Sequence, residues 1–334
     1  MEYMYGLHSH TWDSIEIEDA KKLIGPILIL GASGFIGAKL FFNLSQCRND
    51  IFGCSRDIKN SWRFKYHNWQ NLESLDITNY KEVERLSKRI RPKTIFNLSS
   101  YGGHSHQTDI EQIHQVNYIG ATNILRAIAD IEYGAFIQAG SSSEYGLNSA
   151  GPKEDAKLVP NSAYAESKVK SYYMVNYYGQ AMFPVMHLRL YSIYGPWQER
   201  KTLMPVLISH CLENKWPPLV DKEASHDFVY VDDCAYAFVK AALALYEKKG
   251  FGKAVNIATG VKTKTEDLVK ISQRIFGVTS EPIFGSMLNE GRDLVNWYGN
   301  PELALKELSW YPRVGLNQGI ELTSRWEQEF KKTA

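Results

Sequence analysis

The sequence has few cysteines, almost no net charge and no long apolar run, and each shortage excludes a class of protein. Its four cysteines in 334 residues form no C-x-x-C pair and have no histidines at zinc-site spacing. We therefore expect free thiols and no metal site, rather than a disulfide framework. The 38 basic and 37 acidic residues leave a net charge of +1, which argues against a nucleic-acid partner. Because no apolar run approaches the length of a membrane span, we expect no membrane partner either.

The first 24 residues lack the basic start and the apolar core of a secretory signal. We interpret residues 1–24 as an N-terminal extension and predict a cytoplasmic protein. Repeats and low-complexity tracts are missing as well, and a hydrophobic content of 44% with 22% charged residues is typical of a globular chain.

Short apolar runs alternate with helical patterns through the first two thirds of the chain. The runs that predict buried strands are "PILIL" (26–30), "DIFGC" (50–54), "TIFNL" (94–98), "AFIQA" (135–139) and "PVMHLRL" (184–190). Strands separated by helices form right-handed βαβ units and a parallel sheet with both faces covered. The predicted fold class is therefore α/β, a Rossmann-like doubly wound parallel sheet.

Capping signals and apolar periodicity predict the helices. Asn79 with Glu82 begins a helix that runs to about Arg89, and Thr263 with Glu266 begins another. Long helical patterns cover residues 110–131 and 162–178.

Prolines interrupt the pattern after Leu190, at positions 196, 205, 217 and 218. We predict a dinucleotide-binding domain made of residues 25–192 and about 226–262. Residues of about 193–225 and 263–334 then form a smaller, mixed C-terminal lobe that binds the substrate.

The stretch "ILGASGFIG" places Gly31, Gly34 and Gly37 between the first strand and a helix. Such glycines allow a tight turn and a close approach to a pyrophosphate, and the helix N-terminus attracts its negative charge. The spacing is G-x-x-G-x-x-G instead of G-x-G-x-x-G, and a tight turn without a ligand is the alternative. We predict a cofactor site formed by the three glycines with Ser33, Phe35 and Ile36.

The end of the second strand carries Ser55 and Arg56, where a carboxylate would bind the ribose of NAD. A hydroxyl and a guanidinium suit a 2′-phosphate. This favours NADP(H) over NAD(H), although Asp57 follows directly and a solvated Arg56 is the alternative.

Tyr164 and Lys168 stand four residues apart in "YAESK", on one face of a predicted helix. A free tyrosine has a pKa of about 10 and is a poor base, but a nearby ammonium group favours the phenolate. In a chain that also carries a dinucleotide-binding loop, such a pair can take a proton from a hydroxyl while a nicotinamide takes the hydride. An exposed helical pair is the alternative.

Seven motifs in order carry a resemblance over residues 26–270: "GASGFIG", "FNLSS", "NYIGATNIL", "AGSSSEYG", "YAESK", "LRLYSIYGP" and "HDFVYVDD". Together they resemble the extended short-chain dehydrogenase/reductase family, in its nucleotide-sugar epimerase, dehydratase and reductase group. The resemblance implies a nucleotide-diphosphate sugar as substrate and a homodimer that pairs the 110–131 helix with the Tyr164 helix.

The resemblance also assigns roles to single residues. Counting back from Tyr145 makes Ser141 the hydroxyl that binds the reacting sugar oxygen, with Ser142 and Ser143 as candidates if the register shifts. The predicted cofactor site further includes Asp76, Ile77, Leu98, Ser99 and Tyr191, besides Tyr164 and Lys168. The predicted substrate contacts are Asn117, Glu144, Ser192, Arg200, His226 and Arg292.

The reaction stays open between related chemistries. An epimerase or a 4-keto reductase acting at C4 of the hexose is favoured. A 4,6-dehydratase is the alternative, because a one-residue shift would make Ser142-Ser143-Glu144 the family's dehydratase triplet. The alternative from another class is a non-catalytic NADP-sensing protein, although such proteins commonly lose the tyrosine or the lysine.

Overall fold

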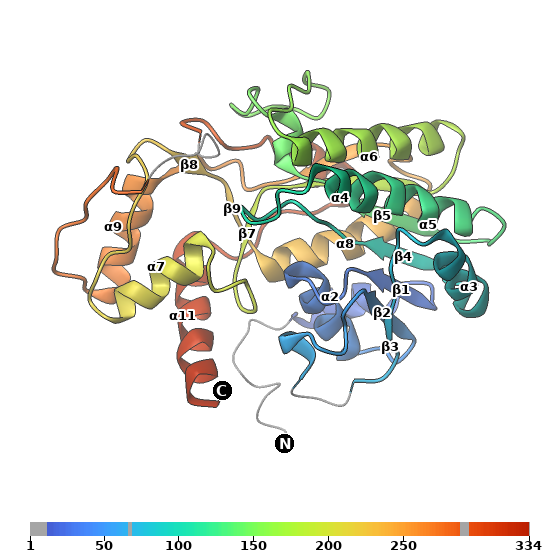
Figure 1. Ribbon diagram of the computed structural model, residues 1–334, viewed down its shortest axis with the longest axis horizontal. Coiled ribbons are helices and arrows are strands. Elements are labelled where there is room, and N and C mark those ends of the chain that lie inside the picture. Colours follow the sequence, from blue (N-terminus) through green and yellow to red (C-terminus); the bar gives the residue numbers. More distant parts are fainter. Residues whose placement is uncertain (1–11, 66–68, 288–293, 334) are drawn as a thin grey trace.

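A computed structural model describes residues 12–65, 69–287 and 294–333 (Figure 1). Its centre is a parallel sheet of seven strands in the order β3-β2-β1-β4-β5-β6-β10. The strands are β1 (Ile27–Leu30), β2 (Ile51–Ser55), β3 (Leu72–Ser74), β4 (Thr94–Asn97), β5 (Ala135–Ala139), β6 (Val185–Leu190) and β10 (Ala254–Ile257). The order reverses between β1 and β4, which confirms the predicted doubly wound fold.

Alternate side chains of each strand enter two separate cores, one on each face of the sheet. Ile27 and Ile29 pack against α1 (Ser14–Lys21), α2 (Phe35–Ser45) and α8 (Val231–Tyr246). Leu28 and Leu30 pack on the other face, against α3 (Tyr80–Ile90), α5 (Ala121–Ala127) and α6 (Ala163–Gln180). Because both faces are covered, β1 is apolar throughout instead of alternating with polar residues.

The capping predictions had mixed outcomes. Asn79 caps α3 as predicted, accepting a hydrogen bond from the N–H of Glu82. The second predicted helix is also present as α9 (Thr265–Phe276), but its N-cap is Lys264 and not Thr263. Thr263 belongs instead to the short strand β11 (Thr263–Lys264), which pairs with β8 (Ser225–His226).

The predicted helix over residues 110–131 is interrupted. It consists of α4 (Ile110–His114), a π-helical segment Gln115–Gly120 and α5, and it ends at Ala127. A π-helical insertion accommodates one extra residue per turn and is often found beside a functional site.

The C-terminal lobe forms its own small core beside the sheet (Figure 1). It contains the parallel pair β7 (Ser192–Tyr194) and β9 (Phe228–Tyr230), with α7 (Leu203–Leu212), α9 and α11 (Leu316–Thr333), whereas α10 (Glu302–Leu308) packs on α8 and β10. Since β7 follows β6 directly, the lobe begins at the carboxyl edge of the sheet.

The described part of the predicted extension packs on α8 as helix α1. Asp13 caps this helix, Asp19 accepts a hydrogen bond from the Tyr236 hydroxyl at 2.7 Å, and Arg313 pairs with Asp13 at 2.8 Å. Among the described ranges, the helices are all too short or too polar to span a bilayer.

Candidate active site

The predicted cofactor residues follow the carboxyl ends of parallel strands, which lie along one edge of the sheet. Gly31 follows β1, Ser55 ends β2, Leu98 follows β4 and Tyr191 follows β6. Ligands of doubly wound sheets bind at this edge, where the strand order reverses.

The glycine loop is built for a close backbone approach. Gly31 has φ of +79°, and a Cβ there would lie 2.5 Å from the backbone nitrogen of Ser99. A Cβ on Gly37 would lie 2.3 Å from the carbonyl oxygen of Gly31. Helix α2 begins at Phe35 with Gly34 as N-cap and without a side-chain cap. Its first-turn N–H groups are therefore left for a ligand, which fits a pyrophosphate.

A groove runs along this edge from the glycine loop. Nine predicted cofactor residues line it: Gly31, Ser33, Gly34, Ser55, Arg56, Asp76, Ile77, Leu98 and Ser99. The Ser55 hydroxyl is buried and has no hydrogen-bond partner within the described residues. Asp57 also lines the groove, but its carboxylate accepts a hydrogen bond from the Asn60 amide at 2.8 Å.

Tyr164 and Lys168 lie on α6 as predicted. The Lys168 side chain is buried, its Nζ donates to the carbonyl oxygen of Ala139 at 3.0 Å, and it lies 5.6 Å from the centre of the Tyr164 ring. Gly102 and Gly103 pass over this ring, so that a Cβ on Gly103 would lie 4.0 Å from the Tyr164 hydroxyl and contact little else. Gly103 therefore leaves space beside the hydroxyl, whereas a Cβ on Gly102 would lie 2.7 Å from the Ile113 side chain.

The three candidate serines form a 3₁₀ turn after β5. The Ser143 hydroxyl donates to the Ser141 hydroxyl oxygen at 2.8 Å. The Ser142 hydroxyl oxygen accepts a hydrogen bond from the Trp297 indole at 3.1 Å. Trp297 thus brings the C-terminal lobe to the serine turn, a contact between residues too far apart in sequence to be predicted from spacing.

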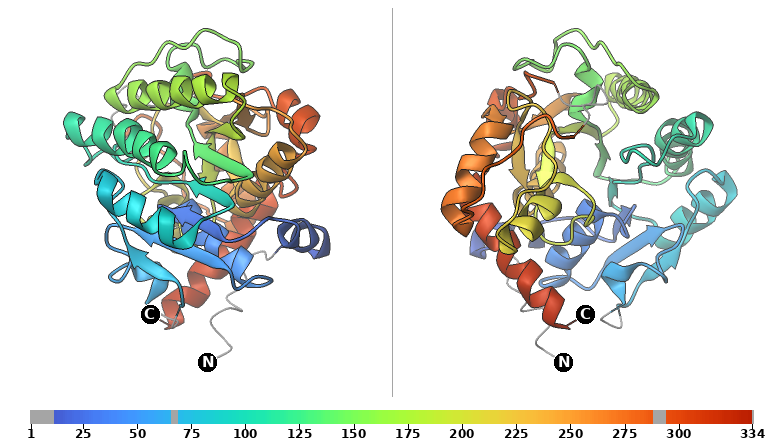
Figure 2. Two further views of the ribbon diagram at one scale, coloured as in Figure 1. Left: turned by 90° about the vertical axis from the view of Figure 1, so that its right-hand side faces the viewer. Right: turned by 60° about the vertical axis from the view of Figure 1, so that its left-hand side comes forward.

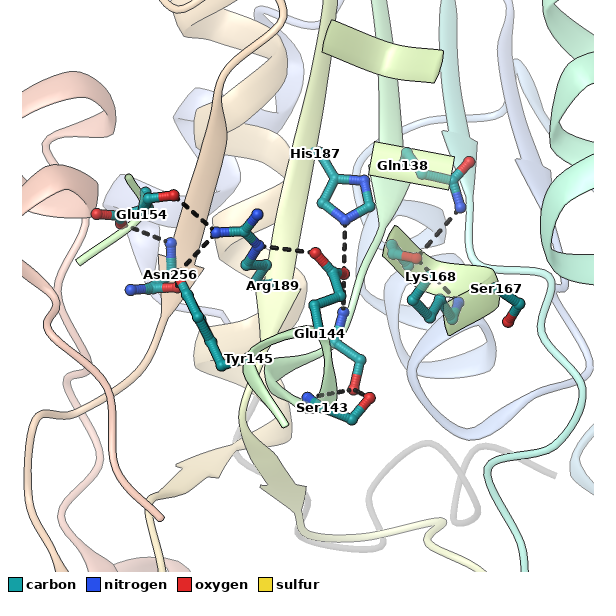
Figure 3. Close-up of polar contacts among 12 residues, drawn as sticks. Gln138, Ser143, Glu144, Tyr145, Glu154, Ser167, Lys168, His187, Arg189 and Asn256 are labelled. Atoms are coloured by element: carbon teal, nitrogen blue, oxygen red, sulfur yellow. Dashed lines mark hydrogen bonds and ion pairs between the residues drawn. The ribbon is translucent and has the colours of Figure 1, made fainter. Parts of the chain in front are cut away.

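The Glu144 side chain points toward His187 and Arg189 in a fully buried polar cluster (Figure 3). Its carboxylate accepts hydrogen bonds from the Ser141 backbone N–H at 2.8 Å, from Nε2 of His187 at 2.7 Å and from Nε of Arg189 at 2.7 Å. The Arg189 guanidinium also stacks on the rings of Tyr145 and Tyr172. Glu144 therefore supports the serine turn from beneath.

Burial and pairing set the charges of this cluster. Burial raises the pKa of the Glu144 carboxyl, but the His187 and Arg189 donors lower it by more, so it stays ionised. Burial lowers the pKa of His187 despite its carboxylate neighbour. We infer a neutral imidazole that donates from Nε2, and a charged pair formed by Glu144 and Arg189.

The amide group of the Asn117 side chain is also hydrogen-bonded within the protein. Its side chain accepts from the Tyr101 backbone N–H at 2.9 Å and donates to the Tyr101 carbonyl at 2.8 Å and the Ser167 hydroxyl at 2.9 Å. It thus joins the π-helical segment to α6, which holds Tyr164.

An apolar pocket in the lobe lies next to the sheet edge. His226 and Lys201 line it, together with Leu207, Phe228 and Leu268 among others. Nδ1 of His226 lies 3.2 Å from the Ser192 hydroxyl, so the structure brings these two predicted substrate residues together.

Three other predicted residues lie elsewhere. The Arg200 guanidinium stacks over Phe330 of α11. Tyr191 is buried, with its ring against Gly299, and does not line the groove. Arg292 lies outside the described residues. Within those residues, no three His, Cys, Asp or Glu side chains are grouped to hold a metal ion.

Residues 27–258 match the NAD dependent epimerase/dehydratase family. The chain belongs to this family. The predicted resemblance to nucleotide-sugar-modifying members of the extended short-chain dehydrogenase/reductases is thereby confirmed.

Relatives match over nearly the whole chain. A UDP-glucose 4-epimerase of Mycolicibacterium smegmatis is 26% identical, over 89% of this chain and 96% of its own length. Among solved structures, the UDP-glucose 4-epimerase of Thermotoga maritima with UDP-glucose has a TM-score of 0.80 at 23% identity, covering 91% and 99% of the two chains. A UDP-glucuronic acid 4-epimerase of Bacillus cereus, in complex with UDP-glucuronic acid and NAD, has a TM-score of 0.75 at 24% identity, covering 91% and 99%.

Proposed function

We propose that this protein is an NAD(P)-dependent enzyme that acts at C4 of a nucleotide-diphosphate hexose, as an epimerase or a 4-keto reductase. The observation that carries this proposal is the arrangement around Tyr164. A buried lysine lies 5.6 Å from the centre of the phenol ring, Gly103 leaves space beside the hydroxyl, and the serine turn follows the strand end of β5.

The chain's own residues then have defined roles. The groove fits a dinucleotide, because the first-turn N–H groups of α2 have no side-chain cap and the Ser55 hydroxyl has no partner within the described residues. When bound, the cofactor supplies the hydride acceptor or donor. Tyr164 takes the proton from the C4 hydroxyl, or returns it to a C4 ketone. Lys168 places its ammonium group 5.6 Å from the centre of the Tyr164 ring, and the Ser141 and Ser143 hydroxyls orient the sugar oxygen.

The lobe pocket is the proposed site for the nucleotide. Apolar side chains suit the face of a base, while Lys201 and His226 at the lining suit the diphosphate. Solved relatives support this class of substrate, since the Thermotoga maritima protein was solved with UDP-glucose.

We favour NADP(H) as the cofactor. Arg56 lines the groove next to the unpartnered Ser55 hydroxyl, and the competing carboxylate of Asp57 is paired with Asn60. A guanidinium and a hydroxyl suit a 2′-phosphate. The Bacillus cereus relative was solved with NAD, so the proposed preference would distinguish this chain from that one.

A 4,6-dehydratase is less well supported than an epimerase or a reductase. The alternative depended on Glu144 as the carboxylate of the dehydratase triplet, and this carboxylate is buried among Ser141, His187 and Arg189. Retention of both Tyr164 and Lys168 argues against a non-catalytic sensor.

We also propose a homodimer through α6. Tyr173 and Tyr177 expose 59% and 71% of their surface on this helix, and Ile119 of the adjoining π-helical segment exposes 38%. Such a group of apolar side chains is typical of an interface between copies. Sedimentation should give a dimer at micromolar concentration, and a monomer alone would contradict the proposal.

The deciding assay measures absorbance at 340 nm with NADPH and a panel of nucleotide-linked 4-keto-6-deoxyhexoses. Steady loss of NADPH identifies a reductase. If NADPH is not consumed, nucleotide hexoses are incubated with the protein and the products are identified by NMR, where a C4 epimer identifies an epimerase.

Tyr164→Phe should lose turnover by at least about a hundredfold. Tyr311→Phe, at an exposed tyrosine of the lobe, is the matched control. If Tyr164→Phe keeps wild-type turnover, Tyr164 is not the acid/base group.

A further inference from the structure

Arg63 is a buried arginine outside every motif of the sequence. It lies in the 3₁₀ segment Trp62–Phe64 between β2 and β3, and only 4% of its surface is exposed. Its guanidinium makes hydrogen bonds in three directions. Nη1 donates to the carbonyl oxygen of Ser33 at 3.0 Å, Nε to that of Trp197 at 2.9 Å, and Nη2 to the Glu199 carboxylate at 3.0 Å.

The three acceptors lie on chain segments that lead to two different proposed sites. Ser33 lies in the glycine loop, directly before the N-cap of α2, where the cofactor pyrophosphate is proposed to bind. Trp197 and Glu199 lie in the lobe, and Glu199 stands two residues before Lys201 of the nucleotide pocket. Arg63 thus connects the cofactor loop with the chain segment that leads into the substrate pocket.

Aromatic packing surrounds this connection. The Trp197 ring contacts Phe42 of α2 at 5.4 Å, Trp62 at 5.6 Å and Phe330 of α11 at 5.8 Å between ring centres. Figure 2 shows α11 (red) beside the N-terminal part of the chain (blue). The sheet domain and the C-terminal lobe therefore meet in a packed apolar contact, and the buried Arg63 guanidinium lies within it.

The guanidinium is planar and its donors point in fixed directions. It can satisfy Ser33, Trp197 and Glu199 together only when the glycine loop and the 197–199 segment have one relative position. A ligand that orders either segment orders the arginine, and the second ligand then finds its own segment already in place.

We propose that Arg63 is a positioning residue that couples the two sites, so that cofactor and nucleotide each bind more tightly in the presence of the other. This inference rests on the proposed function, because it assumes that both ligands bind. Coupling is reciprocal, so the same factor must appear whichever ligand is titrated. A coupled cofactor is retained while the nucleotide sugar is bound.

The test measures the Kd of NADPH and of NAD⁺ by calorimetry, with and without saturating UDP, and the Kd of UDP with and without cofactor. In the wild type we expect UDP to lower the cofactor Kd by about fivefold or more. In Arg63→Met the ratio of the cofactor Kd without UDP to the cofactor Kd with UDP should fall to about one. Arg63→Lys keeps the charge but cannot reach three acceptors, so it should lose the coupling too, and Glu199→Gln should weaken it.

Arg48→Met is the matched control. Arg48 also bonds a carboxylate, that of Asp50, and the carbonyls of Ala20, Lys21 and Leu23, but it joins α1 to the start of β2, far from the strand ends that form the site. This variant should keep the wild-type coupling, with thermal unfolding confirming that each variant is folded.

The outcomes separate the inference from the proposed function. If the wild type binds both ligands but independently, or if Arg63→Met keeps the wild-type ratio, the coupling role is overturned and the proposed function stands. If the wild type binds neither UDP nor a nicotinamide cofactor, the proposed function fails and this inference fails with it.

Discussion

Replacing Glu144 with glutamine tests whether a buried ion pair supports the serine turn. The change keeps the size of the side chain and removes its charge. Arg189, which is fully buried, then keeps its positive charge without its ion-pair partner. A glutamine has one acceptor oxygen, so it cannot accept from Ser141, His187 and Arg189 together.

Removal of one partner from a buried pair costs about 3–5 kcal/mol, because the other charge stays buried. We expect a loss of that size in the free energy of unfolding, measured by urea denaturation at pH 7. Total stabilities are about 5–15 kcal/mol, so the variant should still fold. Since Ser141 loses the anchor of its backbone N–H, turnover should also fall while the cofactor Kd stays unchanged.

The pKa of Glu144 predicts how the cost of this substitution changes with pH. The two partners lower the pKa of Glu144 in the folded protein more than burial raises it, so its stabilisation is present above the unfolded value and is lost as pH falls through the folded one. The difference in unfolding free energy between wild type and Glu144→Gln should therefore become smaller as pH drops below 4.5, the ordinary pKa of a glutamate.

Glu307→Gln is the control for this experiment. Glu307 pairs with Lys253, which is half exposed, so the loss there should be at most about 1 kcal/mol. If Glu144→Gln costs no more than this control at pH 7, the carboxylate does not balance the charge of Arg189, and our account of the cluster is refuted.

Three further predictions concern other parts of the molecule. Burial raises the pKa of Asp233 to about 7 from 3.8, so the contribution of its protonated carboxyl to stability is lost as pH rises from about 4 to 7. Between pH 4 and 8 the wild type should lose about 3–4 kcal/mol of unfolding free energy relative to Asp233→Asn in urea titrations, and an equal pH dependence of the two proteins would contradict this. Arg56→Ser should weaken NADPH binding by about tenfold to a hundredfold and leave NAD binding nearly unchanged, whereas equal losses for both cofactors would show that Arg56 does not select between them. Lys168→Met should lower kcat by about a hundredfold or more with little change in KM, and an intact kcat would remove Lys168 from the chemistry.

The residues that proved predictable are those whose role depends on local chain geometry. Strand and helix alternation, the glycine spacing at Gly31, and the i, i+4 relation of Tyr164 and Lys168 are all properties of short segments. Each segment has one compatible local conformation, and the βαβ connection rule then brings the strand ends to one edge. The fold and the position of the groove follow from that.

The errors and omissions concern residues whose partners are distant in the chain. Glu144 was assigned to the substrate from its place in a motif, but its side chain contacts His187 and Arg189, more than forty positions away. Thr263 has the spacing of a cap, yet a strand pairing with His226 takes that position. In both cases a tertiary contact outweighed a local signal.

By itself the sequence determined the doubly wound sheet, the dinucleotide loop and the Tyr164–Lys168 pair, because each depends on spacing along a single segment. Only the tertiary structure decided that Glu144 lies beneath the serine turn, that Trp297 reaches Ser142, and that Arg63 joins the glycine loop to the lobe. These contacts link residues 30 to 155 positions apart. The pattern of residues within one segment does not reveal such pairs, because packing of the whole chain brings them together. Buried charges and polar groups must then find partners, and this requirement selects the contacts.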